Sequence, residues 1–148
     1  MSATAATGLD GLAQLQRMMA TGRQPAIGET LAFSLVEVGR GHAVFEGTPD
    51  HSVYNPIGSV HGGYAATLLD SACGVAVHSQ LAAGQGYTTL ELKVSYVRGL
   101  TDRSRLVRAV GRVVSSGRRV AFAEATLHDG DGRLCATATS TLLVFEQS

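Results

Sequence analysis

Cysteine is scarce in this 148-residue chain, which has only Cys73 and Cys135. The two thiols are not in a Cys-x-x-Cys spacing, and no histidine cluster accompanies them. We therefore expect no metal site, and we expect both cysteines to be reduced and packed as small apolar side chains.

An excess of charge of either sign is also absent, because twelve basic residues face twelve acidic ones. A neutral chain has no overall attraction to nucleic acid or to an anionic membrane surface, so neither is expected as a partner. An anionic ligand would have to meet a local cluster of positive charge.

The first 25 residues lack a basic start followed by an apolar core, and they lack the arginine-rich, acid-free composition of a transit peptide. A cytoplasmic location is expected. No internal repeat, low-complexity tract or linker divides the chain, so residues 1–148 are expected to form one domain. Apolar residues at helical spacing from Leu9 to Met19 predict a short helix, which makes residues 1–25 a helical extension.

Strongly apolar runs are few, and the longest extends from Val60 to Ala82. Its alanines, leucines, valines and other small residues do not alternate with polar ones, which predicts one long helix. A membrane span is the alternative, but Asp70, His61 and His78 argue against it, as does the absence of a positively charged flank.

Several shorter runs alternate between apolar and polar residues, which is typical of half-buried strands. Their core-facing residues are mostly small, so the helix should approach the sheet closely. We expect an α+β fold in which an antiparallel sheet of five to six strands curls around one central helix. The expected core faces are Leu90, Leu92, Val94 and Tyr96; Val107, Ala109, Gly111 and Val113; Ala121, Ala123, Ala125 and Leu127; and Leu134, Ala136, Ala138 and Ser140.

The start of the long helix, His61-Gly62-Gly63, leaves unpaired N–H groups at the positive end of the helix dipole. Such a site suits an oxyanion or a polarised carbonyl. Alternatively, the two glycines only let the helix begin close under a strand.

Asp70 is an isolated carboxylate in an otherwise apolar helix. Its charge must be paired, hydrogen-bonded or partly exposed to water, so Asp70 is either a satisfied structural group or a reactive one. The structural alternative is a hydrogen bond to the hydroxyl of Ser71 or Thr67. Asp70 follows His61 by nine residues, which places it on the opposite side of the helix and about 13 Å further along. If the two groups act together, Asp70 must meet the helix start of a second copy across a two-fold axis.

The pattern Asn55, Gly58, His61-Gly62-Gly63 and Asp70, followed by the strand end "YVRG", resembles the hotdog-fold thioesterases of the PaaI type. These include 4-hydroxybenzoyl-CoA, phenylacetyl-CoA and medium-chain acyl-CoA thioesterases. The resemblance extends from about Phe33 to the C-terminus. Relatives commonly have Arg-Pro where this chain has Arg98-Gly99, so the exit of this strand is expected to differ.

The resemblance implies hydrolysis of an acyl-CoA thioester without a cofactor. The N–H of Gly62 would polarise the thioester carbonyl, Asn55 and His61 would orient that carbonyl or its supporting loop, and Asp70 would act as nucleophile or general base. Asn55 alone also reads as an ordinary turn residue before Pro56. A hydroxyl on the following strand often holds the water, and Thr89 is expected in that place because its neighbour Thr88 should face away.

The resemblance also implies partners for the CoA phosphates and for the chain itself. The hairpin turn with Gly117, Arg118 and Arg119 resembles one that some relatives use near the CoA nucleotide, and Arg98, Arg103 and Arg105 form a second basic group. A homodimer with shared active sites is expected, assembled as a dimer of dimers.

Two other functions remain open from the sequence. Hotdog domains also serve as dehydratases of hydroxyacyl thioesters and as acyl-CoA-sensing modules. The Gly-Gly after His61 favours the thioesterase over the dehydratase, and the short first helix has no basic face of the kind that a DNA-binding segment would need.

Overall fold

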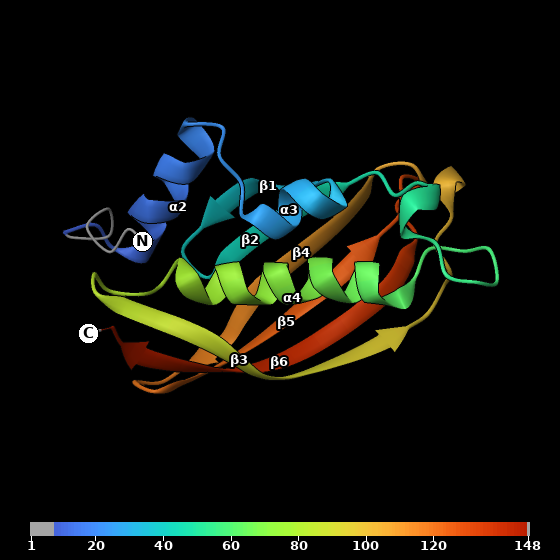
Figure 1. The fold of residues 1–148 in the computed structure, drawn as a ribbon. Helices are drawn as coiled ribbons and strands as arrows, with labels where there is room; N and C mark the ends of the chain where they lie inside the picture. The colour runs from blue at the N-terminus through green and yellow to red at the C-terminus, as the bar shows by residue number, and fades with distance from the viewer. Residues whose placement is uncertain (1–7, 148) are drawn as a thin grey trace.

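The computed structural model describes residues 8–147, in which a six-stranded antiparallel sheet curves around the long helix α4 (Figure 1). The strand order is β1-β2-β4-β5-β6-β3, so β1 and β3 are the two edges. This α+β arrangement confirms the predicted hotdog fold. The elements are α2 (Gly11–Ala20), α3 (Ala26–Leu31), β1 (Phe33–Gly39), β2 (His42–Gly47), the 3-10 turn η1 (His51–Val53), α4 (Gly62–His78), β3 (Gln85–Tyr96), the 3-10 turn η2 (Asp102–Ser104), β4 (Val107–Ser116), β5 (Val120–His128) and β6 (Leu134–Glu146).

Helix α4 lies directly on the sheet because the facing residues are small. A Cβ atom on Gly111 of β4 would overlap the carbonyl oxygen of Ala72 in α4. Ala109 and Ala121 on the same face of the sheet are fully buried. The predicted close approach of helix and sheet is confirmed, and it depends on backbone contact rather than on large interlocking side chains.

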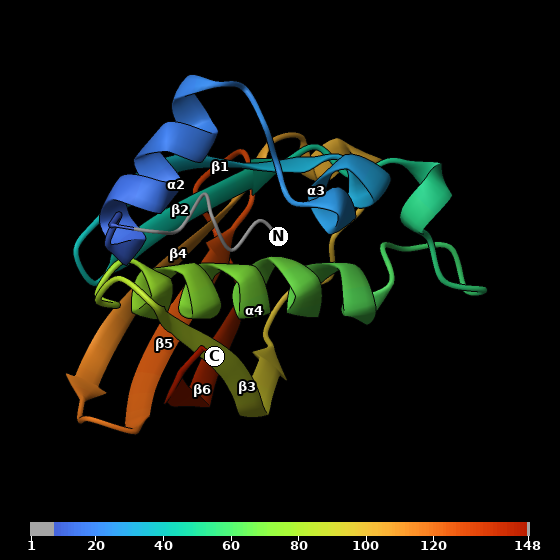
Figure 2. The same ribbon diagram turned by 60° about the vertical axis from the view of Figure 1, so that its left-hand side comes forward.

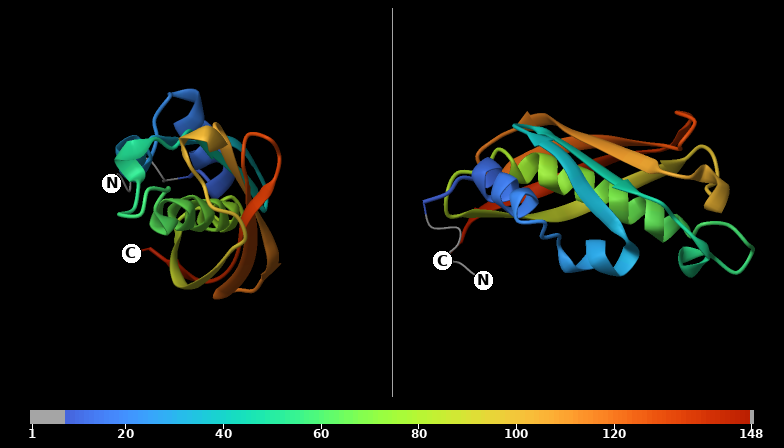
Figure 3. Two further views of the ribbon diagram at one scale, coloured as in Figure 1. Left: turned by 90° about the vertical axis from the view of Figure 1, so that its right-hand side faces the viewer. Right: turned by 90° about the horizontal axis from the view of Figure 1, so that it is seen from above.

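The sheet covers only one side of α4 (Figure 3). The other side keeps a row of partly exposed residues that includes Ala66, Thr67, Asp70 and Ser71. Asp70 therefore lies at the border between the core and the open side of the helix.

No helix within residues 8–147 is both long and apolar enough to span a bilayer.

The first helix, α2, lies beside β1 and the C-terminal end of α4 (Figure 2). The N–H of Gly11 donates to the carbonyl of Leu81 at 2.9 Å, and Gln14 Oε1 lies 2.9 Å from His78 Nε2. Leu15 is buried beneath the helix. Burial lowers the pKa of His78, which favours the neutral imidazole. Residues 1–7 of the expected extension lie outside the described residues.

The structure corrects the bounds of one predicted helix and adds a helix that was not predicted. The long helix was expected from Val60 to Ala82, whereas α4 extends from Gly62 to His78. Helix α3 was not predicted at all. It has only six residues and ends at Ala32, which adopts the left-handed conformation (φ 58°). Six residues are too few to show a helical period in the sequence.

Strand β3 departs from the predicted alternation because it contains a bulge at Leu90. Thr89 pairs with Leu142 of β6, but Glu91 already pairs with Thr141, which leaves Leu90 as the extra residue. Leu90 is 56% exposed, so its predicted place on the core face is wrong. The bulge turns Thr89 onto the inner face, which it shares with Leu92.

The bulge is held by a buried serine on the neighbouring strand. Ser140 is 2% exposed and donates its hydroxyl to the carbonyl of Glu91 at 3.0 Å. This bond satisfies a polar side chain on the core face, as burial requires. A second irregularity, between Leu127 and His128 of β5, buries Cys135 and leaves Leu134 37% exposed, so the predicted core position of Leu134 is also wrong.

Both cysteines are free and buried, as predicted. Burial raises the pKa of Cys73 to about 12, with further contributions from the charges of Asp70 and Glu124. Burial also raises the pKa of Cys135. Neither thiol is activated for nucleophilic chemistry.

Tyr64 carries a buried hydroxyl without a hydrogen-bond partner in the described part of the chain. The residue is 3% exposed, and burial raises its pKa to about 12. Replacing Tyr64 by Phe removes an unsatisfied polar atom and keeps the ring, so we expect the free energy of unfolding to rise by about 1 kcal/mol. Urea unfolding of both proteins would measure the change, and a destabilised Phe variant would show that the hydroxyl has a partner.

Candidate active site

The first turn of α4 presents one free backbone amide. His61 is the N-cap residue, and its Nδ1 accepts a hydrogen bond from the N–H of Gly63 at 2.8 Å. The N–H of Tyr64 donates to the carbonyl of His61 at 3.0 Å. Within residues 8–147, the N–H of Gly62 donates to no acceptor in the hydrogen-bond network. The positive end of the helix dipole therefore carries an unpaired donor at Gly62.

The loop before α4 is organised by Asn55. Its Oδ1 accepts from the N–H of Ile57 at 3.0 Å and from the N–H of Ser59 at 3.1 Å, while Nδ2 donates to Ser59 Oγ at 3.1 Å. Gly58 has a φ of +92°, which a residue with a side chain rarely adopts. Asn55 thus holds the loop that delivers the chain to His61, and its side-chain bonds stay within that loop.

The carboxylate of Asp70 is bonded to the neighbouring strand. Its Oδ1 accepts a hydrogen bond from Thr89 Oγ1 at 3.0 Å. Thr88 is exposed on the outer face of β3. The hydroxyl of Thr67 instead donates to the carbonyl of Gly63 at 2.7 Å. The alternative in which Thr67 or Ser71 binds Asp70 is therefore wrong, and the structure brings together Asp70 and Thr89.

An aromatic ring of β3 covers the helix next to Asp70. Tyr87, two residues before Thr89, lies over Gly74 one helical turn beyond Asp70, with ring atoms 3.0 to 3.5 Å from the place of a Cβ on that glycine. Burial, and then the charge of Asp70, raises the pKa of Tyr87. The other carboxylate oxygen of Asp70, Oδ2, has no hydrogen-bond partner within residues 8–147.

The two groups do not meet within one chain. Gly62 begins α4 and Asp70 follows it on the same rigid helix, with His61 about 13 Å from the level of Asp70 along the axis. The structure brings His61 to Gly62 and Gly63, and Asp70 to Thr89, but it leaves these two clusters separate.

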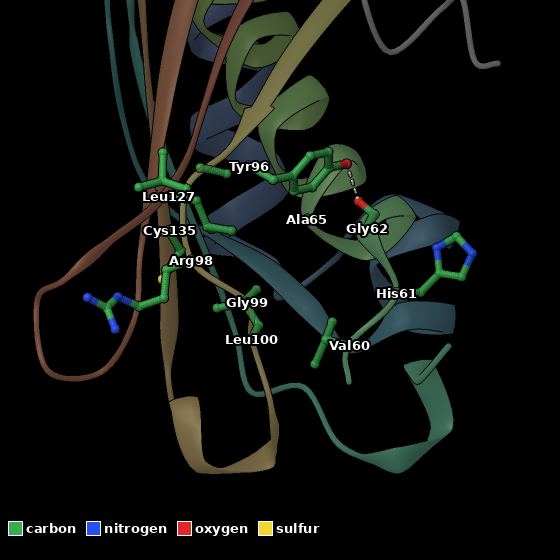
Figure 4. A pocket seen from close by; sticks show the side chains of 12 residues that line it. Val60, His61, Gly62, Ala65, Tyr96, Arg98, Gly99, Leu100, Leu127 and Cys135 are labelled. Atoms are coloured by element: carbon green, nitrogen blue, oxygen red, sulfur yellow. Dashed lines mark hydrogen bonds between the residues drawn. The ribbon is translucent and has the colours of Figure 1, made fainter. Parts of the chain in front are cut away.

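A cavity of about 160 Å³ opens beside Gly62, between the start of α4 and the ends of β3 and β6 (Figure 4). Tyr96 lines it and donates its hydroxyl to the carbonyl of Gly62 at 2.6 Å. The ring of His61 points away from this side (Figure 4). Sequence reasoning treated Tyr96 only as a core-facing residue, whereas it is 56% exposed. The cavity is otherwise mainly apolar, with Val60, Ala65, Leu100, Leu127 and Ala136 among its lining residues.

The candidate phosphate-binding residues lie in two places. Gly117, Arg118 and Arg119 form the exposed turn between β4 and β5, at the end of the sheet opposite to Gly62 (Figure 1). Arg98 borders the cavity, and its guanidinium extends outward (Figure 4). Arg105 is paired with Asp131. No three His, Cys, Asp or Glu side chains between residues 8 and 147 gather as a metal site.

Comparison with known proteins gives a consistent set of relatives. A conserved protein of Pseudomonas aeruginosa is 31% identical, with a TM-score of 0.76 over 82% of this chain and 94% of that one. A phenylacetic acid degradation-related protein of Ralstonia eutropha is 30% identical, with a TM-score of 0.76 over 86% of this chain and 97% of that one. A candidate esterase of Saccharolobus solfataricus is 30% identical over 91 residues, which are 62% of this chain and 59% of that protein.

Most residues of the candidate site lie in a segment that matches a known family. The sequence model of the thioesterase superfamily matches residues 57–136, a segment that contains Gly62, Asp70, Thr89 and Tyr96. Asn55 lies just before the matched segment. Since the match spans more than half of the chain and the fold agrees with it, this protein belongs to the thioesterase superfamily.

Proposed function

We propose that this protein hydrolyses acyl-CoA thioesters to the free acid and CoA. One observation carries the proposal: the same helix has a free N–H at Gly62 and, at Asp70, a carboxylate that accepts a hydrogen bond from Thr89. A thioester carbonyl is electrophilic enough to need only a carboxylate, a water and one oxyanion donor.

Asp70 can act in this reaction in either of two roles. As a general base, Asp70 takes a proton from water while the water oxygen bonds to the carbonyl carbon, and the C–S bond then breaks to release the CoA thiolate. As a nucleophile, Asp70 bonds to the carbonyl carbon, expels the thiolate and leaves an anhydride that water cleaves. In both cases the N–H of Gly62 stabilises the negative charge on the carbonyl oxygen.

We further propose that each site is shared by two copies of the chain. Gly62 and Asp70 are too far apart on α4 to reach one carbonyl, and the open side of α4 leaves Asp70 accessible. Two antiparallel α4 helices related by a two-fold axis would bring Asp70 of each copy to the helix start of the other. We also propose that two such dimers assemble into a tetramer.

The CoA part of the substrate has support from one relative. A hypothetical thioesterase of Streptococcus pneumoniae whose structure contains coenzyme A is 26% identical, with a TM-score of 0.69 over 78% of this chain and 90% of that one. We propose that Gly117, Arg118 and Arg119 bind the CoA phosphates. No ion pair joins either arginine to another residue in the described range, so both guanidinium groups are available.

For the acyl part we propose an aryl or medium-length group. Small residues on α4 near Asp70 do not provide the space, because Cys73 faces the core and Tyr87 covers Gly74. The support comes instead from the cavity beside Gly62, whose volume of about 160 Å³ is close to that needed by one aromatic ring.

A panel of acyl-CoA substrates with a thiol reagent tests the proposal. We expect release of CoA, with the highest kcat/KM for phenylacetyl-CoA, benzoyl-CoA or a medium-chain acyl-CoA. The two buried cysteines should contribute little background to the assay. A steady rise of kcat/KM up to palmitoyl-CoA would contradict the acyl class. Binding without CoA release would contradict hydrolysis and favour a sensor, and interconversion of hydroxyacyl and enoyl thioesters would favour a dehydratase.

A further inference from the structure

Tyr96 connects the end of β3 to the helix residue that presents the free amide. We propose that Tyr96 is a positioning residue, which holds the Gly62 N–H in the direction needed to polarise the thioester carbonyl. This inference rests on the proposed function and adds to it a residue that does not need to touch the reacting atoms.

The contact between Tyr96 and Gly62 is close in two ways. The phenol hydroxyl donates to the carbonyl of Gly62 at 2.6 Å. The hydroxyl and ring atoms of Tyr96 also lie 3.1 to 3.4 Å from the position that a Cβ on residue 62 would take. The ring therefore covers the side of Gly62 that a side chain would occupy, while 56% of Tyr96 stays exposed. A glycine at this position allows the strand end to reach the helix start.

Hydrogen bonds hold the peptide groups on both sides of Gly62, while the Gly62 N–H itself donates to no acceptor within residues 8–147. On one side of Gly62, its carbonyl accepts from the Tyr96 hydroxyl, and the N–H of Gly63 in the same peptide group donates to His61 Nδ1 at 2.8 Å. On the other side, the carbonyl of His61, which shares its peptide group with the free N–H, accepts from the N–H of Tyr64 at 3.0 Å. Two consecutive glycines would otherwise give this turn large conformational freedom. With both neighbouring groups held, the free donor is fixed before substrate arrives, and such preorganisation is what makes an oxyanion donor effective.

Strand β3 thus holds both reactive parts of α4. Thr89 bonds to Asp70 near the middle of the helix, and Tyr96 bonds to Gly62 at its start. The bulge at Leu90 lies between them and places both side chains on the inner face. Tyr96 therefore acts on the helix start in the same way that Thr89 acts on the carboxylate.

The Tyr96→Phe variant tests the inference, because it keeps the ring and removes only the hydroxyl. We expect kcat to fall roughly 3- to 10-fold, which corresponds to the loss of one neutral hydrogen bond, while KM changes less than twofold. The pH profile should keep its shape. Loss of an alkaline limb in the Phe variant would instead identify Tyr96 as an acid or base and overturn the positioning role.

Tyr64→Phe is the matched control. It makes the same chemical change two residues further along α4, at a hydroxyl with no partner in the described chain, and should leave kcat unchanged. A Tyr96→Phe variant with unchanged kcat, or one that loses only thermal stability, would overturn the inference.

A double-mutant cycle gives a second test. In the Gly62→Ala variant the new Cβ displaces the Tyr96 ring, so kcat should fall. In a Tyr96→Ala background the ring is gone, and the same Gly62→Ala change should cost less than twofold. Additive losses would mean that the two residues act independently, which contradicts the inference.

An observation independent of activity separates this inference from the proposed function. In ¹⁵N–¹H spectra, the amide signals of Gly62 and Gly63 should shift or broaden in Tyr96→Phe and stay in place in Tyr64→Phe. If the wild-type protein releases CoA from no thioester, the proposed function fails, and these signals still decide whether Tyr96 holds the helix start. Unchanged signals in Tyr96→Phe would overturn the inference whatever the enzyme does.

Discussion

The Asp70→Asn variant is expected to lose at least about 100-fold in kcat while its fold stays intact. An amide has nearly the same shape as a carboxylate, and its oxygen can still accept the hydrogen bond from Thr89 Oγ1, which measures 3.0 Å in the wild-type protein. It can neither attack a carbonyl nor take a proton from water. The loss should therefore appear in kcat, measured by CoA release, and not in the unfolding midpoint.

Asp131→Asn is a suitable control for that experiment. Asp131 is an exposed carboxylate in the turn between β5 and β6, where it pairs with Arg105 and Arg133. The same chemical change there should leave kcat within twofold of wild type. If the folded Asp70→Asn enzyme retained near-wild-type turnover, Asp70 would be neither nucleophile nor base.

The second large effect is expected when two inactive variants are combined. Gly62→Pro should abolish the polarising donor with little disturbance of the backbone. His61 has φ −58° and ψ 135°, which a residue before proline adopts readily, and proline is well tolerated as the first residue of a helix. The Cβ of the proline would require the Tyr96 ring to yield by a few tenths of an ångström. We expect Gly62→Pro alone to be as inactive as Asp70→Asn.

In a mixed dimer of Gly62→Pro and Asp70→Asn chains, one site inherits both changes and the other inherits neither. Random pairing of equal amounts gives about half mixed dimers with one intact site of two, so roughly a quarter of wild-type activity should return. Native mass spectrometry would show the mixed dimers after co-expression or refolding. Mixed dimers without activity would show that the site is not shared in this way.

The fold could be predicted from the sequence because its strands alternate and its one long apolar run does not. Ala109, Ala121 and Ala125 were placed correctly on the core face by period alone. The irregularities could not be predicted in this way. A bulge changes the period within a strand, and nothing in the residues around Leu90 distinguishes an extra residue from a regular one.

Part of the candidate site could be predicted from the sequence because some of its residue types are unusual at their positions. Gly62 and Asp70 stand out because a glycine pair and a carboxylate are unusual in an apolar helix, and the resemblance to PaaI-type thioesterases pointed to Thr89. The role of Tyr96 could not be inferred, because an aromatic residue at a strand end is ordinary. Its bond to the Gly62 carbonyl depends on how closely two elements 34 residues apart approach each other in space.

The bulge at Leu90 also has an evolutionary consequence. The additional residue shifts the alternation of inward-facing and outward-facing side chains, so that positions 89 and 92, rather than 90 and 92, share the inner face. In a homologue without that residue, the hydroxyl that meets the same carboxylate would stand two residues, rather than three, before the residue equivalent to Leu92. Alignments that place no gap in this strand would then match the functional hydroxyl of one protein with an outward-facing residue of the other. A residue-by-residue comparison of this strand with that of a relative therefore has to take the bulge at Leu90 into account.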